Sequence, residues 1–242
     1  MGQYVIFGGS GGIGREVCLA LLAQGHRVLA AARSQARLDA LDHAAAFDTL
    51  QTTVADAANP ADVARVFEAL PEPPAGVANL AGAFLLKPAH LTSDDEFALQ
   101  LTQNLTTAFN VLRAAVRAMT NSGGSVVLVS SVAARLGLAN HEAVAAAKAG
   151  VEGLVRAAAA SYAPRNIRVN AVAPGLTKTP LTERITASEP ALKASAAMHP
   201  LGRIGEPRDV ALAVAYLLAP AAAWISGQVL SVDGGLSTVR AR

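Results

Sequence analysis

The sequence predicts an α/β fold, a parallel and doubly wound sheet of about seven strands with helices on both faces. Short apolar runs alternate with longer helical patterns from end to end. The apolar runs are continuous and are bounded by Gly, Pro or Asn, which is typical of strands covered on both faces. The 242 residues are 52% hydrophobic and only 4% aromatic, and small residues at this density suit helices packed closely on a sheet.

The expected elements follow one another in regular order. The strands are expected at Tyr4–Phe7, Arg27–Ala31, Thr49–Val54, Gly76–Asn79, Ser125–Val129, Arg168–Val172 and Gln228–Val232. The helices are expected at Ile13–Gln24, Ser34–Leu41, Pro60–Leu70, Ser93–Thr120, Glu142–Ala163 and Pro207–Leu218. Pro60 and Pro207 stand at helix starts, where proline is accepted because the first-turn N–H has no partner within the helix.

Composition argues against several classes of partner. The net charge is +2 without a basic run, so we expect no nucleic acid. The longest apolar run, from Val210 to Ile225, is broken by Pro220 and is shorter than the ~20 residues that span a bilayer, so we expect no membrane contact. The first residues carry no secretory signal pattern, and the single cysteine, Cys18, fits a buried small hydrophobe in a reducing cytosol. We therefore expect a cytoplasmic protein, and we expect no metal site.

A glycine-rich loop follows the first expected strand and opens the first helix. Five glycines fall within the seven residues from Gly8 to Gly14. Glycines permit a tight turn and close approach of the backbone to a pyrophosphate, and the helix N-terminus offers unpaired N–H groups to the phosphates. The candidate dinucleotide-binding residues of this loop are Gly8, Ser10, Gly11, Gly12, Ile13 and Gly14.

The end of the second strand distinguishes the two nicotinamide dinucleotides. A carboxylate there would bind the free ribose 2′-hydroxyl, whereas an arginine suits a 2′-phosphate. The chain has no acid at this point and reads Ala31-Ala32-Arg33. The sequence therefore predicts NADP(H), and residues 1–242 are expected to form a single NADP-binding domain of Rossmann type.

Further motifs occur in order along the chain. Ser131 precedes position 144 by thirteen residues, and Lys148 follows that position by four. The remaining motifs are Asp56, Asn79-Leu80-Ala81-Gly82, Asn104, Pro174-Gly175-Leu176-Thr177-Lys178-Thr179, Leu201-Gly202-Arg203 and Val232-Asp233-Gly234-Gly235. Together with the glycine loop, they resemble the short-chain dehydrogenase/reductase family over essentially the whole chain.

The resemblance implies roles for particular side chains. Ser131 would polarise a substrate carbonyl, Lys148 would bind the nicotinamide ribose, and Asn104 would hold a proton-relaying water. Ser130 could be confused with Ser131, but the spacing to position 144 favours Ser131. The further cofactor-binding residues implied are Asp56, Asn79, Ala81, Gly82, Pro174, Gly175, Thr177 and Thr179. The resemblance also implies a small-molecule substrate and a homotetramer or homodimer.

One position departs from the family pattern. The family has its catalytic tyrosine four residues before the lysine, and here that residue is Val144. The nearest proton donor in sequence is His141, and imidazole is a competent general acid near neutral pH. A plain loop histidine remains an alternative for His141, and for His90 and His199 a solvated loop position is expected.

Two functions follow from these observations. The first is an NADP(H)-dependent oxidoreductase acting on a small carbonyl, imine or activated alkene through an atypical site. The alternative is a non-catalytic NADP-binding sensor or assembly protein, which only Val144 favours.

Residues 175–203 are rich in Pro, Ser and Thr and longer than an ordinary connection, so they are expected to form a substrate lid containing a short helix.

Overall fold

The computed structural model describes residues 1–239, so the last three residues of the expected domain lie outside the described part. Seven parallel strands form one sheet in the order β3-β2-β1-β4-β5-β6-β7. The strands are β1 (Gln3–Phe7), β2 (Arg27–Ala32), β3 (Leu50–Val54), β4 (Gly76–Asn79), β5 (Gly124–Val129), β6 (Ile167–Pro174) and β7 (Val229–Val232). The predicted fold class and all seven predicted strands are confirmed.

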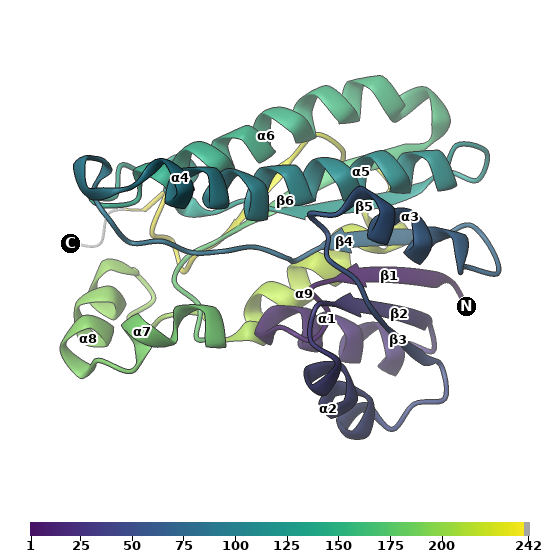
Figure 1. The fold of residues 1–242 in the computed structure, drawn as a ribbon, viewed down its shortest axis with the longest axis horizontal. Coiled ribbons are helices and arrows are strands. Elements are labelled where there is room, and N and C mark those ends of the chain that lie inside the picture. Colours follow the sequence, from purple (N-terminus) through teal and green to yellow (C-terminus); the bar gives the residue numbers. More distant parts are fainter. Residues whose placement is uncertain (240–242) are drawn as a thin grey trace.

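The winding direction of the chain reverses beside β1. In register, Val5 of β1 lies opposite Leu29 of β2 on one side and Val77 of β4 on the other. The chain first runs outward through β2 to β3 and then returns to build β4 to β7 in the other direction (Figure 1). In open α/β sheets, ligands bind in the crevice that such a reversal leaves at the carboxyl ends of the strands.

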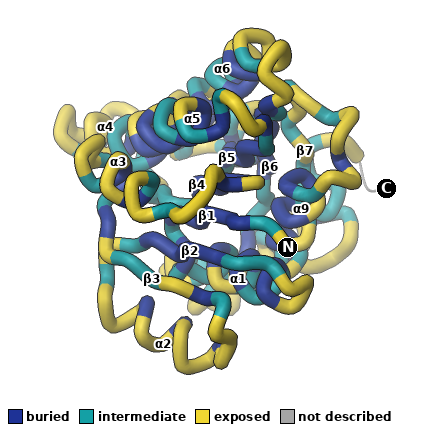
Figure 2. Tube along the Cα trace, turned by 90° about the vertical axis from the view of Figure 1, so that its right-hand side faces the viewer, coloured by how far each residue is buried: buried dark blue, intermediate teal, exposed yellow. Residues whose placement is uncertain are grey.

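Helices cover both faces of the sheet. One face is covered by α1 (Gly12–Ala23), α2 (Gln35–Ala45) and α9 (Pro207–Leu218), and the other by α3 (Pro60–Glu68), α4 (Asp94–Leu101), α5 (Thr107–Ala118) and α6 (Glu142–Tyr162). Tyr4 and Ile6 of β1 pack into the apolar core beneath α1, α2 and α9. Val5 and Phe7 pack into the apolar core on the opposite face of the sheet. Figure 2 shows the buried strands between helices whose outer sides are exposed. Both cores need apolar residues, which explains the continuous apolar runs of the strands.

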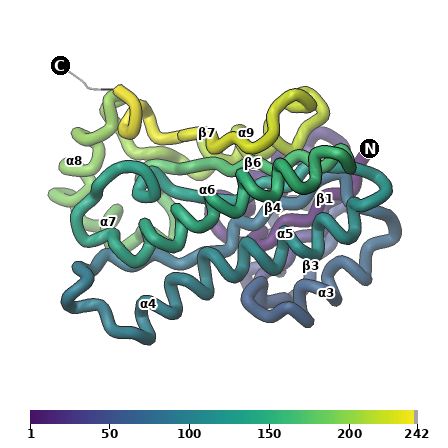
Figure 3. Tube along the Cα trace, turned by 90° about the horizontal axis from the view of Figure 1, so that it is seen from above, coloured from purple at the N-terminus to yellow at the C-terminus, as the bar shows by residue number. Residues whose placement is uncertain are grey.

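The helix predicted over Ser93–Thr120 is not regular throughout. Between α4 and α5, residues Thr102–Thr106 form a π-helical turn in which Asn104 is buried. Figure 3 shows α4 and α5 in line along the sheet, next to α6. A single π turn inside a helix frequently marks a functional site.

The segment after β6 carries two short helices, α7 (Glu183–Thr186) and α8 (Glu189–Met198), which extend beyond the strand ends (Figure 1). Neither contributes a fully buried residue. Among residues 1–239, no helix combines the length and apolar character needed to cross a membrane. The apolar run from Val210 is the buried helix α9 followed by a turn at Pro220–Ala222, as expected.

Candidate active site and dinucleotide cleft

Two adjoining cavities open at the carboxyl ends of the strands. The first, of about 380 Å³, lies over the ends of β1 to β4, and the second, of about 570 Å³, lies over the ends of β4 to β6. Both are lined by Ile13, Leu80, Ala81, Gly82, Thr179 and Leu181. A single elongated ligand can therefore occupy both.

The glycine loop lines the first cavity with backbone rather than side chains. A Cβ at Gly14 would lie 2.1 Å from the carbonyl oxygen of Gly8, so only glycine fits there. Gly8 itself has φ +74, and a Cβ on it would lie 2.7 Å from the backbone of Leu80 and Ala81. Helix α1 begins at Gly12, so the unpaired backbone N–H groups of its first turn lie at the first cavity, next to the closely packed backbone of the glycine loop. This arrangement fits the pyrophosphate of a dinucleotide.

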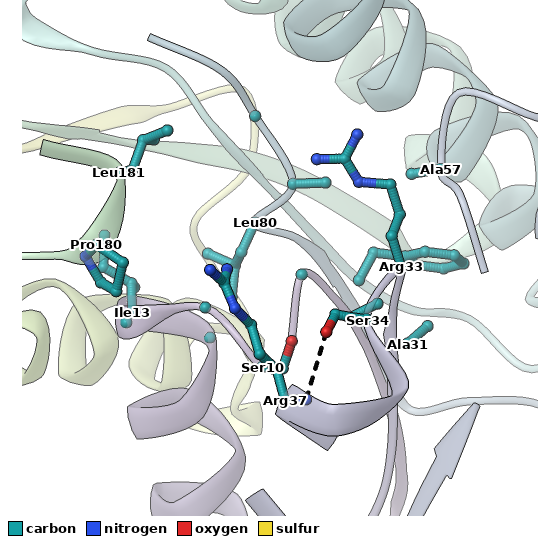
Figure 4. Close-up of a pocket in the computed structure, with 18 of the residues that line it drawn as sticks. Ser10, Ile13, Ala31, Arg33, Ser34, Arg37, Ala57, Leu80, Pro180 and Leu181 are labelled. Carbon is teal, nitrogen blue, oxygen red and sulfur yellow. Dashed lines mark hydrogen bonds between the residues drawn. The ribbon is translucent and has the colours of Figure 1, made fainter. Parts of the chain in front are cut away.

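Two arginines line the first cavity, Arg33 from the turn between β2 and α2 and Arg37 from the first turn of α2. Arg33 and Arg37 both line it, together with Ser10 and Ser34 (Figure 4). The Ser34 hydroxyl oxygen accepts a hydrogen bond from the Arg37 backbone N–H at 3.4 Å and caps α2. The sequence prediction named Arg33 alone. Arg37 could have been found from its place in the first turn of the helix expected at Ser34–Leu41, which begins directly after Arg33.

Asp56 and Asn79 differ in their placement. Asp56 lines the first cavity, and its carboxylate accepts the backbone N–H of Ala58 at 2.9 Å. Asn79 is 2% exposed and does not line either cavity. Its amide donates to Thr107 Oγ1 at 3.3 Å and accepts the backbone N–H of Ala81 at 3.2 Å. Asn79 thereby anchors the backbone beside the cleft from within the core.

The second cavity gathers the four candidate catalytic residues. They arrive from different elements: Asn104 from the π turn, Ser131 from the end of β5, and His141 and Lys148 from the start of α6. Val144 also lines this cavity, one turn before Lys148, and is 3% exposed. The implied cofactor residues Pro174, Gly175, Thr177 and Thr179 complete one wall.

Lys148 is the buried cation of this cavity. Burial lowers the pKa of its ammonium to about 8. Its Nζ donates to the carbonyl of Val129 at 2.8 Å. An ammonium has three N–H donors, so two remain for a ligand such as a ribose hydroxyl.

The π turn directs the Asn104 side chain toward Lys148. A Cβ on Gly82 would lie 2.9 Å from Asn104 Oδ1 and 3.6 Å from Lys148 Nζ, so the three groups meet at one point. Asn104 Nδ2 donates to the carbonyl oxygens of Ala83 and Gln100, and its Oδ1 accepts the backbone N–H of Ala83. The amide is thus held in one orientation.

Ser131 and Ser130 point to different surroundings. Ser131 Oγ accepts the Ala133 backbone N–H at 3.2 Å and starts a 3-10 turn, Val132–Ala134, which leaves its hydroxyl proton free to donate into the cavity. The Ser130 hydroxyl is buried and donates to Glu152 at 2.9 Å. Both serines line the second cavity, but the Ser130 hydroxyl is bound to Glu152, whereas that of Ser131 can donate to a ligand.

His141 stands at the mouth of the same cavity. Its Nδ1 lies 2.8 Å from the carbonyl oxygen of Ala139, and because a carbonyl only accepts, Nδ1 carries a proton. Its ring meets Phe84 edge-on with centroids 5.7 Å apart. The preceding Asn140 has φ +64, a conformation that asparagine tolerates better than most residues. Nε2 is therefore the atom whose proton distinguishes imidazolium from imidazole.

The expectation of a solvated His199 is wrong. His199 is 4% exposed, lines the second cavity at the end of α8, and donates from Nδ1 to the carbonyl of Ser195 at 2.7 Å. It packs against Gly175, where a Cβ would lie 2.7 Å from its Nε2. His90 is exposed, as expected. Burial of His199 arises from tertiary contacts that its loop position in the sequence does not reveal.

Comparison with known proteins agrees with this geometry. The family model described as enoyl-(acyl carrier protein) reductase matches residues 8–237. The chain is 36% identical to carbonyl reductase family member 4 of Danio rerio over 239 residues, covering 96% of each protein. It is 32% identical to the 3-oxoacyl-[acyl-carrier-protein] reductase FabG of Vibrio cholerae over 236 residues, again 96% of each. A solved short-chain type dehydrogenase/reductase from Mycobacterium ulcerans superposes with a TM-score of 0.93 at 30% identity, covering 98% of this chain and 90% of that one.

The chain belongs to the short-chain dehydrogenase/reductase family. These relatives are short-chain oxidoreductases. Among the solved members of the family, an NADPH-bound short-chain oxidoreductase from Pseudomonas aeruginosa PAO1 is described as containing an atypical catalytic center. It superposes with a TM-score of 0.92 at 29% identity, covering 99% of this chain and 98% of that one.

Proposed function

We propose that the chain is an NADP(H)-dependent oxidoreductase that transfers a hydride to or from a small carbonyl, imine or activated alkene. One observation carries this proposal: Ser131, Asn104 and Lys148 converge on one cavity that continues into the glycine-loop cavity. The second cavity is lined mostly by apolar side chains, which favours an uncharged substrate with an apolar body.

The preference for NADP(H) rests on Arg33 and Arg37. Guanidinium groups bind phosphate in a bidentate manner, and the two arginines flank the first cavity with the hydroxyls of Ser10 and Ser34 beside them. We expect NADPH to bind more tightly than NADH, and we expect Arg33→Asp and Arg37→Ala each to shift the preference toward NADH. Fluorescence titration measures both affinities, with Arg208→Asp on α9, outside both cavities, as the control. Equal affinities of the wild type for the two dinucleotides would exclude this assignment.

In the proposed reaction, NADPH would supply the hydride when bound, and side chains of the protein stabilise the charge that develops on the substrate oxygen. Ser131 donates its hydroxyl proton as a hydrogen bond to that oxygen. The imidazolium of His141 then gives its Nε2 proton to the oxygen, while Nδ1 stays bound to Ala139. Lys148 would hold the nicotinamide ribose, and Asn104, which lies near the ammonium, would orient a water there.

We assign Val144 to the position at which the family has its tyrosine, because it precedes Lys148 by one turn and faces the cavity. Val144→Tyr should add a proton donor worth roughly 10²-fold or more in kcat on activated ketones. Val144→Phe is the matched control, since it adds the ring without the hydroxyl. A gain in both variants would attribute the effect to cavity filling rather than to proton transfer.

A substrate screen separates the enzyme from the non-catalytic alternative. NADPH oxidation is followed at constant enzyme concentration with ketones, quinones, imines and enones. Turnover that falls to a low but measurable level in Ser131→Ala supports the oxidoreductase. Tight NADPH binding without turnover in any substrate class would favour a sensor or assembly protein.

Three further assignments belong to the proposal. Residues 175–203 act as the substrate lid, since α8 contributes Ala191, Ala194, Ser195 and Met198 to the second cavity. The chain assembles as a homotetramer or homodimer, which the exposed apolar side chains Phe109, Leu212, Tyr216 and Trp224 support. It works in the cytoplasm, for which the single, buried Cys18 with its thiol pKa raised by burial to about 12 is the supporting feature.

A further inference from the structure

A buried carboxylate that the proposed reaction does not use lies next to the catalytic residues. Glu152 is on α6, one turn after Lys148, and is 6% exposed. Glutamate is almost never fully buried unless it is paired, because removing its charge from water is costly. The hydrogen-bond partners of Glu152 therefore indicate the role of this buried carboxylate.

Both partners of Glu152 come from the segment that carries Ser131. Arg135 donates from Nε to the two carboxylate oxygens at 3.0 and 2.8 Å, and its side chain is 42% exposed. Ser130 donates from its buried hydroxyl to Oε1 at 2.9 Å. Ser130 directly precedes Ser131, and Arg135 follows the 3-10 turn that Ser131 begins. One carboxylate thus binds the chain on both sides of Ser131.

Helix α6 holds this segment at a third point. The Lys148 ammonium donates to the carbonyl of Val129, the last residue of β5, at 2.8 Å. The backbone N–H groups of Ala134 and Arg135 bind the carbonyls of Ser131 and Val132 within the 3-10 turn. The Ser131 hydroxyl is therefore carried by a short, hydrogen-bonded loop whose two ends are fixed to the same helix that carries Lys148.

We propose that Glu152 is a positioning residue, which sets the Ser131 hydroxyl relative to Lys148 by binding Ser130 and Arg135. The inference rests on the proposed function, in which the Ser131 hydroxyl donates a hydrogen bond to the substrate oxygen. A displacement of about 1 Å at a reacting group is enough to lower a rate by roughly 10²-fold. Charge-assisted hydrogen bonds from Arg135 and Ser130 provide the rigidity that such positioning needs.

The first test compares kcat and NADPH affinity in Glu152→Gln and Arg135→Gln. Glutamine keeps the size of Glu152 and one acceptor oxygen but removes the charge, and Arg135 is exposed enough to be replaced without opening the core. We expect kcat to fall by roughly tenfold in both variants, with the dissociation constant of NADPH unchanged. Glu72→Gln is the matched control, because it breaks the exposed Glu72–Arg27 ion pair at the other end of the sheet. Equal kcat in all three variants and the wild type would overturn the proposal.

A double-mutant cycle identifies the residue through which Glu152 acts. In a Ser131→Ala background, Glu152→Gln should cause no further loss of kcat, because the hydroxyl that Glu152 positions is gone. An additional loss of the full tenfold would show that Glu152 acts only on stability or through another group, and would overturn the proposal.

Amide hydrogen exchange gives a readout that does not depend on finding a substrate. We expect Glu152→Gln to speed the exchange of the Ala134, Arg135 and Leu136 amides, which are hydrogen-bonded in the wild type, and to leave the glycine loop unchanged. Unchanged exchange at these amides would overturn the positioning role even in an active enzyme. Absence of turnover in the wild type, with faster exchange in Glu152→Gln, would contradict the proposed function alone.

Discussion

At the scale of single residues, the proposed reaction makes His141 the proton donor. Its Nδ1 proton is committed to Ala139, so only the imidazolium has a proton to give from Nε2. We expect His141→Ala to lower kcat by roughly 10²-fold or more at an unchanged NADPH affinity.

The control for His141 is His90→Ala, because His90 is exposed and lies outside both cavities. This variant should keep the wild-type kcat. If His141→Ala also keeps it, solvent or the substrate supplies the proton.

Lys148 should make the stability of the protein rise with pH. Burial lowers its pKa to about 8 from 10.5, so between these values the unfolded state binds more protons than the folded state, and the free energy of unfolding increases with pH. The full difference amounts to roughly 3 kcal/mol. Lys148→Met should lack this rise. Chemical denaturation of the wild type and of Lys148→Met at pH 7 and pH 10, without cofactor, measures the free energy of unfolding of each protein. The same change with pH in both proteins would contradict this prediction.

Sequence patterns identified single residues where the motif fixes the spacing, and missed those whose partners are distant in the chain. Ser131, Asn104, Lys148 and His141 were predicted, and the structure brings all four to one cavity. The pairing of Glu152 with Arg135 and Ser130 was not predictable, because these residues stand 17 and 22 positions away along the chain. Burial of His199 was also missed, since it depends on contacts between α8 and Gly175.

At the scale of elements, the strands were predictable and the finer helix geometry was not. Strands buried on both faces leave continuous apolar runs, as Val126 to Val129 does in β5. The π turn at Thr102–Thr106 leaves no such pattern, because its residues fit a regular helix equally well. In the folded chain, the Asn104 side chain of this turn donates to the carbonyl oxygen of Ala83, 21 positions away, a contact that sequence patterns do not reveal.

The lid helices should open more readily than any other element. None of the residues of α7 and α8 is fully buried, so opening exposes little apolar surface. We expect trypsin to cut first at the exposed Arg184 or Lys193. NADPH together with a substrate analogue should slow this cleavage, because the lid lines the cavity that they would fill.

Mass spectrometry of the first fragments identifies the cut. A protein carrying Arg184→Gln and Lys193→Gln should resist cleavage within α7 and α8. A first cut at Arg113 or Arg117 in α5, or equal rates with and without ligands, would show that residues 175–203 do not act as a lid.

At the scale of the whole molecule, the ligand-binding crevice follows from chain topology. The order β3-β2-β1-β4-β5-β6-β7 places the ends of β1 and β4 side by side at the reversal, where both cavities meet. Alternation of strands and helices predicted the parallel sheet, since parallel neighbours need crossover helices. The shape of the second cavity could not be predicted, because loops from four separate parts of the chain build it.

NADPH should stabilise the whole fold, because its cleft is built from the ends of successive strands and exists only in the folded state. A ligand present at a hundred times its dissociation constant stabilises by about 2.7 kcal/mol. For a chain of this length we therefore expect Tm to rise by roughly 5–10 °C. Adenosine 2′,5′-bisphosphate fits only the first cavity, so at equal concentration it should raise Tm less than NADPH, which reaches Lys148 in the second. Differential scanning calorimetry compares the two, with Lys148→Met as the variant in which their effects should converge. Equal shifts in the wild type would mean that the nicotinamide end makes no stabilising contact in the second cavity, and would contradict the assignment of Lys148 to the ribose.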